Sequence, residues 1–469
     1  MVSLLKDKFG GILREINRFT GFIRQNKLIC AVFLFSLSFF IYQHSTGFSW
    51  DFSAYVLNAR YILGEGFNFE WIRQPLPSLI ILAFSFLGLA SEYVYIIFVS
   101  LLHLYSSLKF SEKFDVDRTA FYVFSMNVFA LIFALKVGSE LLSLALLQLF
   151  LAHIYEKRSG IYYGLSVLAR YTNINFVILF LLQKKAGKIV FSLLLALLAA
   201  MPWLIFSYAN TGNPFIGFID SYALNVNMRN RDGVASPFLA TDLLFAFNFT
   251  LPLFLIGLSS RRNKNYYLIL FVAALSVVSF ATIPMKEARY LFPITVGAAY
   301  FSAISVKDYE YKKTLLYAFV LLTALSLLLM PSAIREQENP QLYTELAGKN
   351  ITCMAKSNAW VPLNYYGLPS EPYPEKEQLE ASLNSGYVVI LAKGISSPDY
   401  LHNEPFLRQH PIMEETKDYI ILQGEGCRPQ QKSGLIFLDR VADYYETLDR
   451  NVTKCEIAFG NICRYFHAM

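Results

Sequence analysis

Charged side chains gather in the polar stretch 45–91, which follows the first apolar segment of the chain. Asp51 stands directly before residues 52–63, whose apolar side chains recur at helical spacing, so we expect it at the N-cap of a helix. Arg60 and Arg73 follow in the same stretch. As a cap alone, Asp51 would contribute about 1 kcal/mol to local stability. A carboxylate fixed at this position can also accept a proton from a reacting group, and the two roles can coexist.

The composition indicates the surroundings in which these side chains act. Of 469 residues, 55% are hydrophobic, 16% aromatic and 16% charged, and the mean hydropathy is +0.39. An ordinary soluble domain is roughly 25% charged. The values exclude a disordered chain, a fibre, a small disulfide scaffold and a single soluble enzyme domain. The sequence contains no Walker loop, dinucleotide fingerprint, His-Glu-x-x-His or Cys-x-x-Cys motif.

Apolar segments long enough to cross a membrane follow one another along the first two thirds of the chain. A crossing helix needs about 20 mostly apolar residues. Segment 160–183 has lysine or arginine at both ends, which predicts two short helices, out and back, broken around Arg170-Tyr171-Thr172-Asn173. With this pair we expect about eleven crossings, the others near 28–44, 92–109, 119–136, 139–155, 189–208, 240–259, 266–284, 290–306 and 314–331.

The positive charges indicate an orientation in the plasma membrane. Six of the first 27 residues are Lys or Arg, so segment 1–27 is expected in the cytosol. It is not expected to be a cleavable signal peptide, because its charged region is long. Alternating crossings over 28–331 then place 20 of the 28 basic residues before 332 in cytosolic loops. Because these residues lie along one membrane face, we expect no nucleic-acid binding.

The C-terminal stretch 332–469 has a different character and is expected outside the cytosol. It holds 13 basic and 18 acidic residues, a net charge of −5, against 28 basic and 17 acidic, a net +11, in the remainder. Four of the five cysteines lie there, an even number that permits disulfides in an oxidising compartment. The four are Cys353, Cys427, Cys455 and Cys463, and two glycosylation sequons, at Asn350 and Asn451, favour the same location. Three strand-like runs, 387–392, 419–422 and 435–438, predict a small soluble α/β or α+β domain.

Five short motifs over 28–331 occur in an order that resembles GT-C glycosyltransferases, in particular the polyprenyl-phosphate-dependent protein O-mannosyltransferases and lipid A aminoarabinose transferases. The motifs are Asp51 with Ala54-Tyr55 and Arg73-Gln74-Pro75-Leu76-Pro77, Ser139-Glu140, Gly164-Leu165 through Arg170, Pro202-Trp203 with Gly212-Asn213-Pro214, and Lys286-Glu287-Ala288-Arg289-Tyr290 through Pro293. Two positions depart from the family. Phe52 stands where many members have a second acid, and Gln74 replaces a residue of a Glu-Lys-Pro motif, which leaves the donor sugar open.

The resemblance implies transfer of a sugar, such as mannose or another hexose, from a polyprenyl or dolichyl phosphate to an acceptor on the extracytoplasmic face, with inversion at the anomeric carbon. The family's catalytic Asp falls on Asp51, which would act as general base. A phosphate leaving group needs preorganised positive partners. Arg289 and Lys286 are the first candidates for these partners, and Arg60, Arg73 and Arg170 are the next.

The remaining candidates would contact the substrates. Glu140 is the second candidate catalytic residue and would bind sugar hydroxyls, the acceptor or a divalent metal ion, and Tyr55, Glu287 and Tyr290 would line the site. No metal ligand is assigned and no other cofactor is implied. The expected partners are the lipid-linked donor, a protein, lipid or glycan acceptor, and the bilayer itself.

Other interpretations stay open on the sequence alone. A transporter or flippase of a lipid-linked or small polar substrate would favour internal repeats and charges near mid-membrane, and neither is apparent. A non-catalytic scaffold would leave Asp51, Glu140 and Arg289 dispersed. Arg289 could pair only with Glu287, and loop 209–239 could be a lid or a solvated connector.

Two further features have ordinary packing as the favoured interpretation. His103 and His153 lie inside predicted spans without an evident acidic partner, so we expect them to be packed in the core. The aromatic and amide residues of 357–366 suit a sugar-binding surface, but an ordinary packed edge is the expectation.

Overall fold

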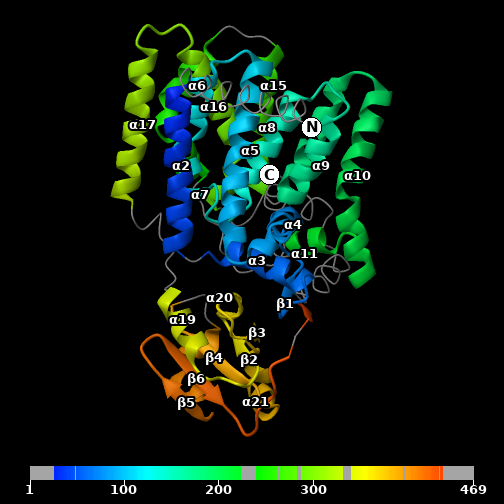
Figure 1. The fold of residues 1–469 in the computed structure, drawn as a ribbon, viewed down its shortest axis with the longest axis vertical. Helices are drawn as coiled ribbons and strands as arrows, with labels where there is room; N and C mark the ends of the chain where they lie inside the picture. The colour runs from blue at the N-terminus through cyan, green and yellow to red at the C-terminus, as the bar shows by residue number, and fades with distance from the viewer. Residues whose placement is uncertain are drawn as a thin grey trace, which may run out of the picture.

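The computed structural model describes residues 26–47, 49–222, 239–260, 264–282, 287–330, 340–394, 398–431 and 434–436. Helices stand side by side in one bundle, and a small sheet domain lies beyond one end of it (Figure 1). Short elements of the first polar loop lie between these two parts (Figure 1). The predicted class, a polytopic helical membrane protein with a C-terminal domain of mixed α and β structure, is confirmed.

Six helices among the described residues are long and apolar enough to cross a membrane. Each of the six coincides with a predicted span. Most residues of α10 and α17 are not buried inside the protein, as expected for helices that face lipid. The six are α2 (Lys27–Thr46), α5 (Ala90–Phe114), α10 (Ala186–Thr211), the combined α13–α14 segment (Ala240–Leu258), α15 (Lys264–Thr282) and α17 (Lys312–Leu329).

Two predicted spans are divided into shorter helices, one of them the α13–α14 segment just named. Span 119–136 divides into α6 (Arg118–Ser125) and α7 (Val128–Phe133) at Asn127, whose Oδ1 accepts the Ala130 amide at 2.9 Å and caps α7. Span 240–259 divides into α13 (Leu239–Phe247), the 3-10 turn η4 (Asn248–Thr250) and α14 (Leu251–Leu258).

Two helices of the bundle are buried on almost every side. The whole of α8 (Glu140–Ala152) and most of α16 (Ile294–Ser305) are buried. Segment 160–183 forms the predicted pair, α9 (Ser159–Ala169) and the 3-10 helix η2 (Tyr171–Gln183), with Arg170 in an extended conformation between them.

The first polar loop folds into α3 (Trp50–Ile62), β1 (Asn68–Glu70), α4 (Pro75–Ala83) and η1 (Ser85–Leu87). The helix expected at 52–63 is present, but the prediction that Asp51 caps it is wrong. Ser49 is the cap, because its backbone is extended and its Oγ accepts the Phe52 amide at 3.4 Å. Asp51 therefore lies in the first turn of α3, and its carboxylate is available for other partners.

The C-terminal domain contains a five-stranded mixed sheet in the order β3-β2-β4-β6-β5. The parallel neighbours β3, β2 and β4 are joined by helical connections, and β6 runs antiparallel to both β4 and β5. The elements are α19 (Pro340–Gly348), β2 (Ala355–Ser357), α20 (Trp360–Tyr365), β3 (Ser370–Pro372), η6 (Lys376–Gln378), α21 (Leu379–Asn384), β4 (Val388–Ala392), η7 (Asp399–His402), α22 (Glu404–Leu407), β5 (Ile412–Glu415) and β6 (Tyr419–Gln423).

The three predicted strand runs have different outcomes. Strands β4 and β6 match the runs at 387–392 and 419–422. The third run begins as predicted, as β7 (Gly434–Ile436), but it pairs in parallel with β1 of the first loop rather than joining the domain's own sheet. The predicted domain boundary near 332 lies outside the described residues.

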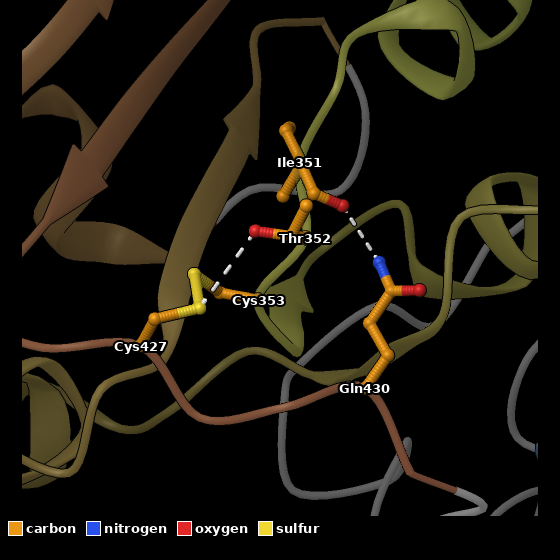
Figure 2. Close-up of a disulfide and its surroundings, with 5 residues drawn as sticks. All are labelled: Ile351, Thr352, Cys353, Cys427 and Gln430. Atoms are coloured by element: carbon orange, nitrogen blue, oxygen red, sulfur yellow. Dashed lines mark hydrogen bonds between the residues drawn. A yellow bond between two sulfur atoms is a disulfide. The ribbon is translucent and has the colours of Figure 1, made fainter.

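One disulfide closes within the C-terminal domain, between Cys353 and Cys427 (Figure 2). The two cysteines are 74 residues apart in sequence, so the bond ties the chain after β6 to the chain before β2. Cys455 and Cys463 lie outside the described residues.

Candidate active site

Helix α3 is packed on two sides, and this fixes the place of Asp51. Phe52 and Tyr55 belong to the core of the helical bundle. Ala54 and Leu57, on another side of the same helix, belong to the core of the sheet domain. Because two separate cores hold α3, its first turn has a defined position between the bundle and the sheet domain.

Asp51 lies between two arginines that come from distant parts of the chain. Its Oδ2 accepts a hydrogen bond from Nη1 of Arg289 at 2.5 Å, and its Oδ1 accepts one from Nη1 of Arg73. Arg289 belongs to η5 (Ala288–Leu291), directly before α16, whereas Arg73 directly precedes α4. The three side chains are 16–20% exposed, so they are partly open to their surroundings. The predicted meeting of an acid with a guanidinium is therefore present.

Two further acids hold the far sides of these arginines. Glu70 accepts from Nε of Arg73 at 2.6 Å, and Glu287 pairs with Arg289. Burial alone would raise the pKa of Asp51, but the charges and hydrogen bonds of Arg73 and Arg289 outweigh it and hold the pKa well below its ordinary value. Asp51 is thus an ionised hydrogen-bond acceptor at neutral pH.

Glu140 and Arg170 form a second acid–arginine pair. Nη1 of Arg170 donates to Glu140 at 2.6 Å, and Oγ of Ser139 donates to the other Glu140 oxygen at 3.1 Å. The Glu140 and Arg170 side chains are only 3% and 6% exposed. The Tyr290 ring joins the pair to the Asp51 cluster, because the Arg170 and Arg289 guanidinium carbons lie 5.3 and 5.5 Å from its centroid.

Tyr55 occupies the side of α3 that faces the bundle core. Its hydroxyl donates to Oε1 of Gln74 at 2.5 Å. Burial, followed by the charge of Asp51, raises its pKa above the ordinary range, so the hydroxyl remains protonated. Gln74, which departs from the family motif, therefore has a partner within the site.

Sequence reasoning missed two residues of this site, Glu70 and Asn58. Asn58, buried on α3, donates from Nδ2 to the Glu70 carbonyl at 2.9 Å and accepts the Glu70 amide on Oδ1 at 2.8 Å. The sequence offered one indication of each residue, namely its position relative to residues already assigned to the site. Glu70 lies three residues before Arg73, and Asn58 lies on the expected helix.

Arg60 does not join the Asp51 cluster, so the structure does not support its prediction as a phosphate ligand. Its Nη1 donates to the Tyr365 carbonyl at 3.1 Å, and its Nη2 lies 3.7 Å from Glu92. Arg60 occurs near the end of α3, about two and a half turns from Asp51, so it lies on another side of the helix and contacts the sheet domain instead. Buried Glu92 also accepts from the Tyr365 hydroxyl at 2.8 Å and contacts His44 at 3.0 Å.

Several other predictions can be placed on the structure. His103 is buried as expected, but His153 has an acidic partner that was not foreseen, because its Nδ1 lies 3.1 Å from Glu156 one turn later. In segment 357–366 the buried Trp360 packs edge-on against Trp50 at 6.1 Å, so this part of the segment forms a packed edge. Lys286 and most of loop 209–239 lie outside the described residues.

No group of three or more His, Cys, Asp or Glu side chains within the described residues is arranged to hold a metal ion. In the Asp51 cluster and at Glu140, each carboxylate is paired with an arginine. This donor set does not favour Mg²⁺ or Ca²⁺, which need converging free oxygen ligands.

The arrangement of the helical bundle, the first loop and the appended sheet domain is shared with solved structures, and this confirms the fold that the motifs predicted. The solved structures that share it include two of ArnT, an aminoarabinose transferase of the GT-C superfamily, from Cupriavidus metallidurans. The structure bound to undecaprenyl phosphate has a TM-score of 0.57 and 12% identity over 88% of this chain and 100% of that chain.

The apo structure of ArnT gives a TM-score of 0.56 and 11% identity over 86% of this chain and 98% of that chain. The sequence matches no protein-family model and no curated protein. At this level of identity the likeness establishes the fold, and the activity has to be argued from the residues.

Proposed function

We propose that the protein is an integral-membrane glycosyltransferase that moves a sugar from a polyprenyl-phosphate donor to a nucleophile on an acceptor. The observation that carries the proposal is the position of Asp51 between the guanidinium groups of Arg73 and Arg289. A general base beside two phosphate-binding groups is the minimum that this reaction needs. The GT-C fold supports the proposal, since one protein with this fold was solved with undecaprenyl phosphate bound.

The arginines are suited to a phosphate because their present partner is also an anion. Arg289 offers Nη1 to Asp51, and a phosphate oxygen, like that carboxylate oxygen, is an anionic acceptor that a guanidinium can bind. We propose that the donor phosphate displaces Asp51 from Arg289, while Glu287 keeps the guanidinium oriented. Arg73, held by Glu70, stays beside Asp51 or shares the phosphate.

Loss of a guanidinium partner makes Asp51 a stronger base when the donor is bound, because the positive charge that lowers its pKa has turned to the phosphate. In the reaction the acceptor oxygen bonds to the anomeric carbon and passes its proton to Asp51. The bond from that carbon to the phosphate oxygen breaks, and its electron pair leaves with the phosphate, where Arg289 stabilises the charge. Direct attack gives inversion at the anomeric carbon.

We assign the buried residues positioning roles in the same site. Arg170 would hold the Tyr290 ring against Arg289 rather than bind the phosphate itself, because Glu140 occupies it at 2.6 Å. Tyr55 and Gln74 would contact the sugar or the acceptor. A hexose such as mannose is the proposed sugar, and a protein, lipid or glycan hydroxyl the proposed acceptor.

We propose that the site faces the extracytoplasmic side of the plasma membrane, together with the C-terminal domain. The disulfide between Cys353 and Cys427 supports this side, because disulfides persist in oxidising compartments. The basic N-terminal segment supports a cytosolic N-terminus.

The test is transfer by the purified full-length protein in bilayer nanodiscs, with a panel of polyprenyl-phosphate sugars. The substitution Asp51→Asn should lower the transfer rate by about 10²–10⁴-fold while polyprenyl-phosphate binding persists. Asp115→Asn is the matched control, because that carboxylate is 95% exposed and lies at the C-terminal end of α5. Unchanged turnover in Asp51→Asn would remove the base, and binding of no polyprenyl phosphate by the wild type would remove the function.

A further inference from the structure

We propose that Glu70 is a positioning residue whose place is set by the C-terminal strand β7, so that the disulfide-closed end of the sheet domain controls how Arg73 meets Asp51. The inference rests on the proposed function and adds a control of the same site. It concerns residues that the sequence motifs do not include, namely Glu70 in the first loop and strand β7, which lies more than 300 residues after Asp51.

Glu70 is held at both its side chain and its backbone. Its carboxylate accepts from Nε of Arg73 at 2.6 Å, which leaves Nη1 of Arg73 for Asp51. Its amide and carbonyl are both hydrogen-bonded by the Asn58 side chain, at 2.8 and 2.9 Å. A change in the position of this short strand therefore passes directly to the Arg73 guanidinium.

Strand β7 is the element that pairs with β1. The two run parallel with Asn68 opposite Gly434 and Glu70 opposite Ile436. The Gly434 amide donates to the Phe67 carbonyl at 3.0 Å. Leu435 packs on a buried aromatic cluster that includes Phe69 and Trp71. A three-residue strand is not stable alone, so β1 depends on its partner for its position.

The root of β7 is fixed to the sheet domain. The disulfide joins Cys427 to Cys353, and Nε2 of Gln430 donates to the Ile351 carbonyl at 2.7 Å (Figure 2). The Arg428 carbonyl accepts the Met354 amide at 2.8 Å. Gly434 follows Cys427 by seven residues, which span at most about 25 Å when extended. The anchored root therefore limits where β7 can lie.

The sheet domain also holds β1 and α3 directly. Nδ2 of Asn68 donates to the Ser370 carbonyl at 2.5 Å, and Ala54 and Leu57 of α3 belong to the sheet-domain core. These contacts fix α3 and the start of β1, while β7 pairs along β1 as far as Glu70. Loss of β7 should therefore change the Arg73–Asp51 geometry without dissociating the domain.

The experiment is steady-state transfer by the full-length protein, with kcat and KM measured separately. Glu70→Ala should lower kcat about tenfold, because misplaced catalytic groups cost rate even when substrate still binds. Glu70→Gln should recover most of this loss, because the amide oxygen can still accept from Nε of Arg73. A residue that only stabilised the fold would not show this rescue by Gln.

The link to the strand is tested by a double-mutant cycle. Leu435→Pro replaces the side chain that packs on the aromatic cluster and restricts the backbone of β7, and it should reproduce the kcat loss of Glu70→Ala. The combination of the two should be no worse than either alone, because both act through one contact. The pair Cys353→Ser with Cys427→Ser should give a smaller loss of the same kind, and exposed Gln431→Ala should give none.

Two outcomes would overturn the proposal. If the kcat losses of Glu70→Ala and Leu435→Pro multiply in the double variant, the two residues act independently. If folded Leu435→Pro has a normal kcat, β7 does not control the site. Thermal unfolding of each variant identifies a folding defect, and the cysteine pair then still tests the link. If the wild type transfers no sugar, the proposed function fails, and this result is distinct from normal turnover in the variants.

Discussion

Two acid–arginine assemblies lie on either side of Tyr290, and they differ in their access to ligands. In one, Asp51 is shared by Arg73 and Arg289, and these side chains are 16–20% exposed. In the other, Glu140 and Arg170 form a single pair that is 3–6% exposed. The same residue types therefore form one partly exposed assembly, where we propose that a ligand replaces a partner, and one buried assembly.

The difference in exposure between the two assemblies follows from the helices and loops on which their residues lie. Asp51, Arg73 and Arg289 lie on short elements next to the helix ends, where solvent or a headgroup can approach. Glu140 opens the fully buried helix α8, and Arg170 lies at the break between α9 and η2. A buried charge without its partner is much more costly than an accessible one. Separating the pair should therefore affect folding, whereas separating the cluster should affect binding and rate.

The largest effect that separates the two assemblies is expected from Glu140→Ala. The substitution leaves Arg170 buried without a counter-charge, which typically costs about 3–5 kcal/mol of stability. Thermal unfolding in detergent measures the loss. The matched control is Glu404→Ala, which breaks an exposed pair with Arg408 and should not change the unfolding temperature measurably. Normal stability of Glu140→Ala would mean that Arg170 finds another partner and that the two assemblies are not distinct.

A smaller effect, on binding, is expected from Arg289→Gln. Charge-assisted hydrogen bonds contribute about 1.5–3 kcal/mol, so the affinity for polyprenyl phosphate should fall about 10- to 100-fold. Titration of the purified protein with the lipid phosphate measures it. Because the site is accessible, stability should change little. Arg170→Gln should show the opposite result, a large loss of stability with little change in the affinity of the folded protein. If the folded fractions of both variants lost affinity equally, the assignment of the phosphate to Arg289 would be contradicted.

The span pattern and much of the Asp51 cluster could be predicted from the sequence. The length of apolar segments, the asymmetry of charge and short motifs can all be recognised from residues that are close together in the sequence. The break at Arg170 was visible for the same reason. The pairing of Asp51 with Arg289 was expected only by resemblance, since 238 residues separate them. Ser49 rather than Asp51 as the cap was not predicted, because both are good cap residues two positions apart.

Contacts between the two parts of the molecule had no sequence signal. Arg60 looked like a site residue because it lies on the same helix as Asp51, yet its turn of α3 faces Tyr365 of the sheet domain. The pairing of β7 with β1 joins two three-residue strands that are over 360 residues apart in sequence. Such short strands carry almost no pattern, and their register is set by the packing around them.

The link between the assemblies should be weaker than either assembly. Tyr290→Leu keeps an apolar side chain but removes the ring that Arg170 and Arg289 approach at 5.3 and 5.5 Å. A cation–π contact contributes about 0.5–2 kcal/mol, so polyprenyl-phosphate affinity should fall roughly 2- to 30-fold. Tyr290→Phe, which keeps the ring, should retain the affinity. A loss in Tyr290→Phe equal to that in Tyr290→Leu would assign the effect to the hydroxyl and not to the guanidinium contacts.

The smallest effect is expected from lowering the pH, because kcat/KM of the wild type should hardly change over the range that we consider. Because Arg73 and Arg289 depress the pKa of Asp51 in the folded protein, its ionised form persists below the ordinary value of about 3.9. The stability from these pairs is present above that value and is lost only as the pH falls through the lower folded pKa. Between pH 7 and about 5, kcat/KM should therefore show no acid limb from Asp51. Arg289→Gln removes one depressing charge, so an acid limb should move upward toward this window in that variant. A limb at the same pH in the wild type and in Arg289→Gln would mean that the titrating group is not Asp51 and that the accessible assembly does not tune it.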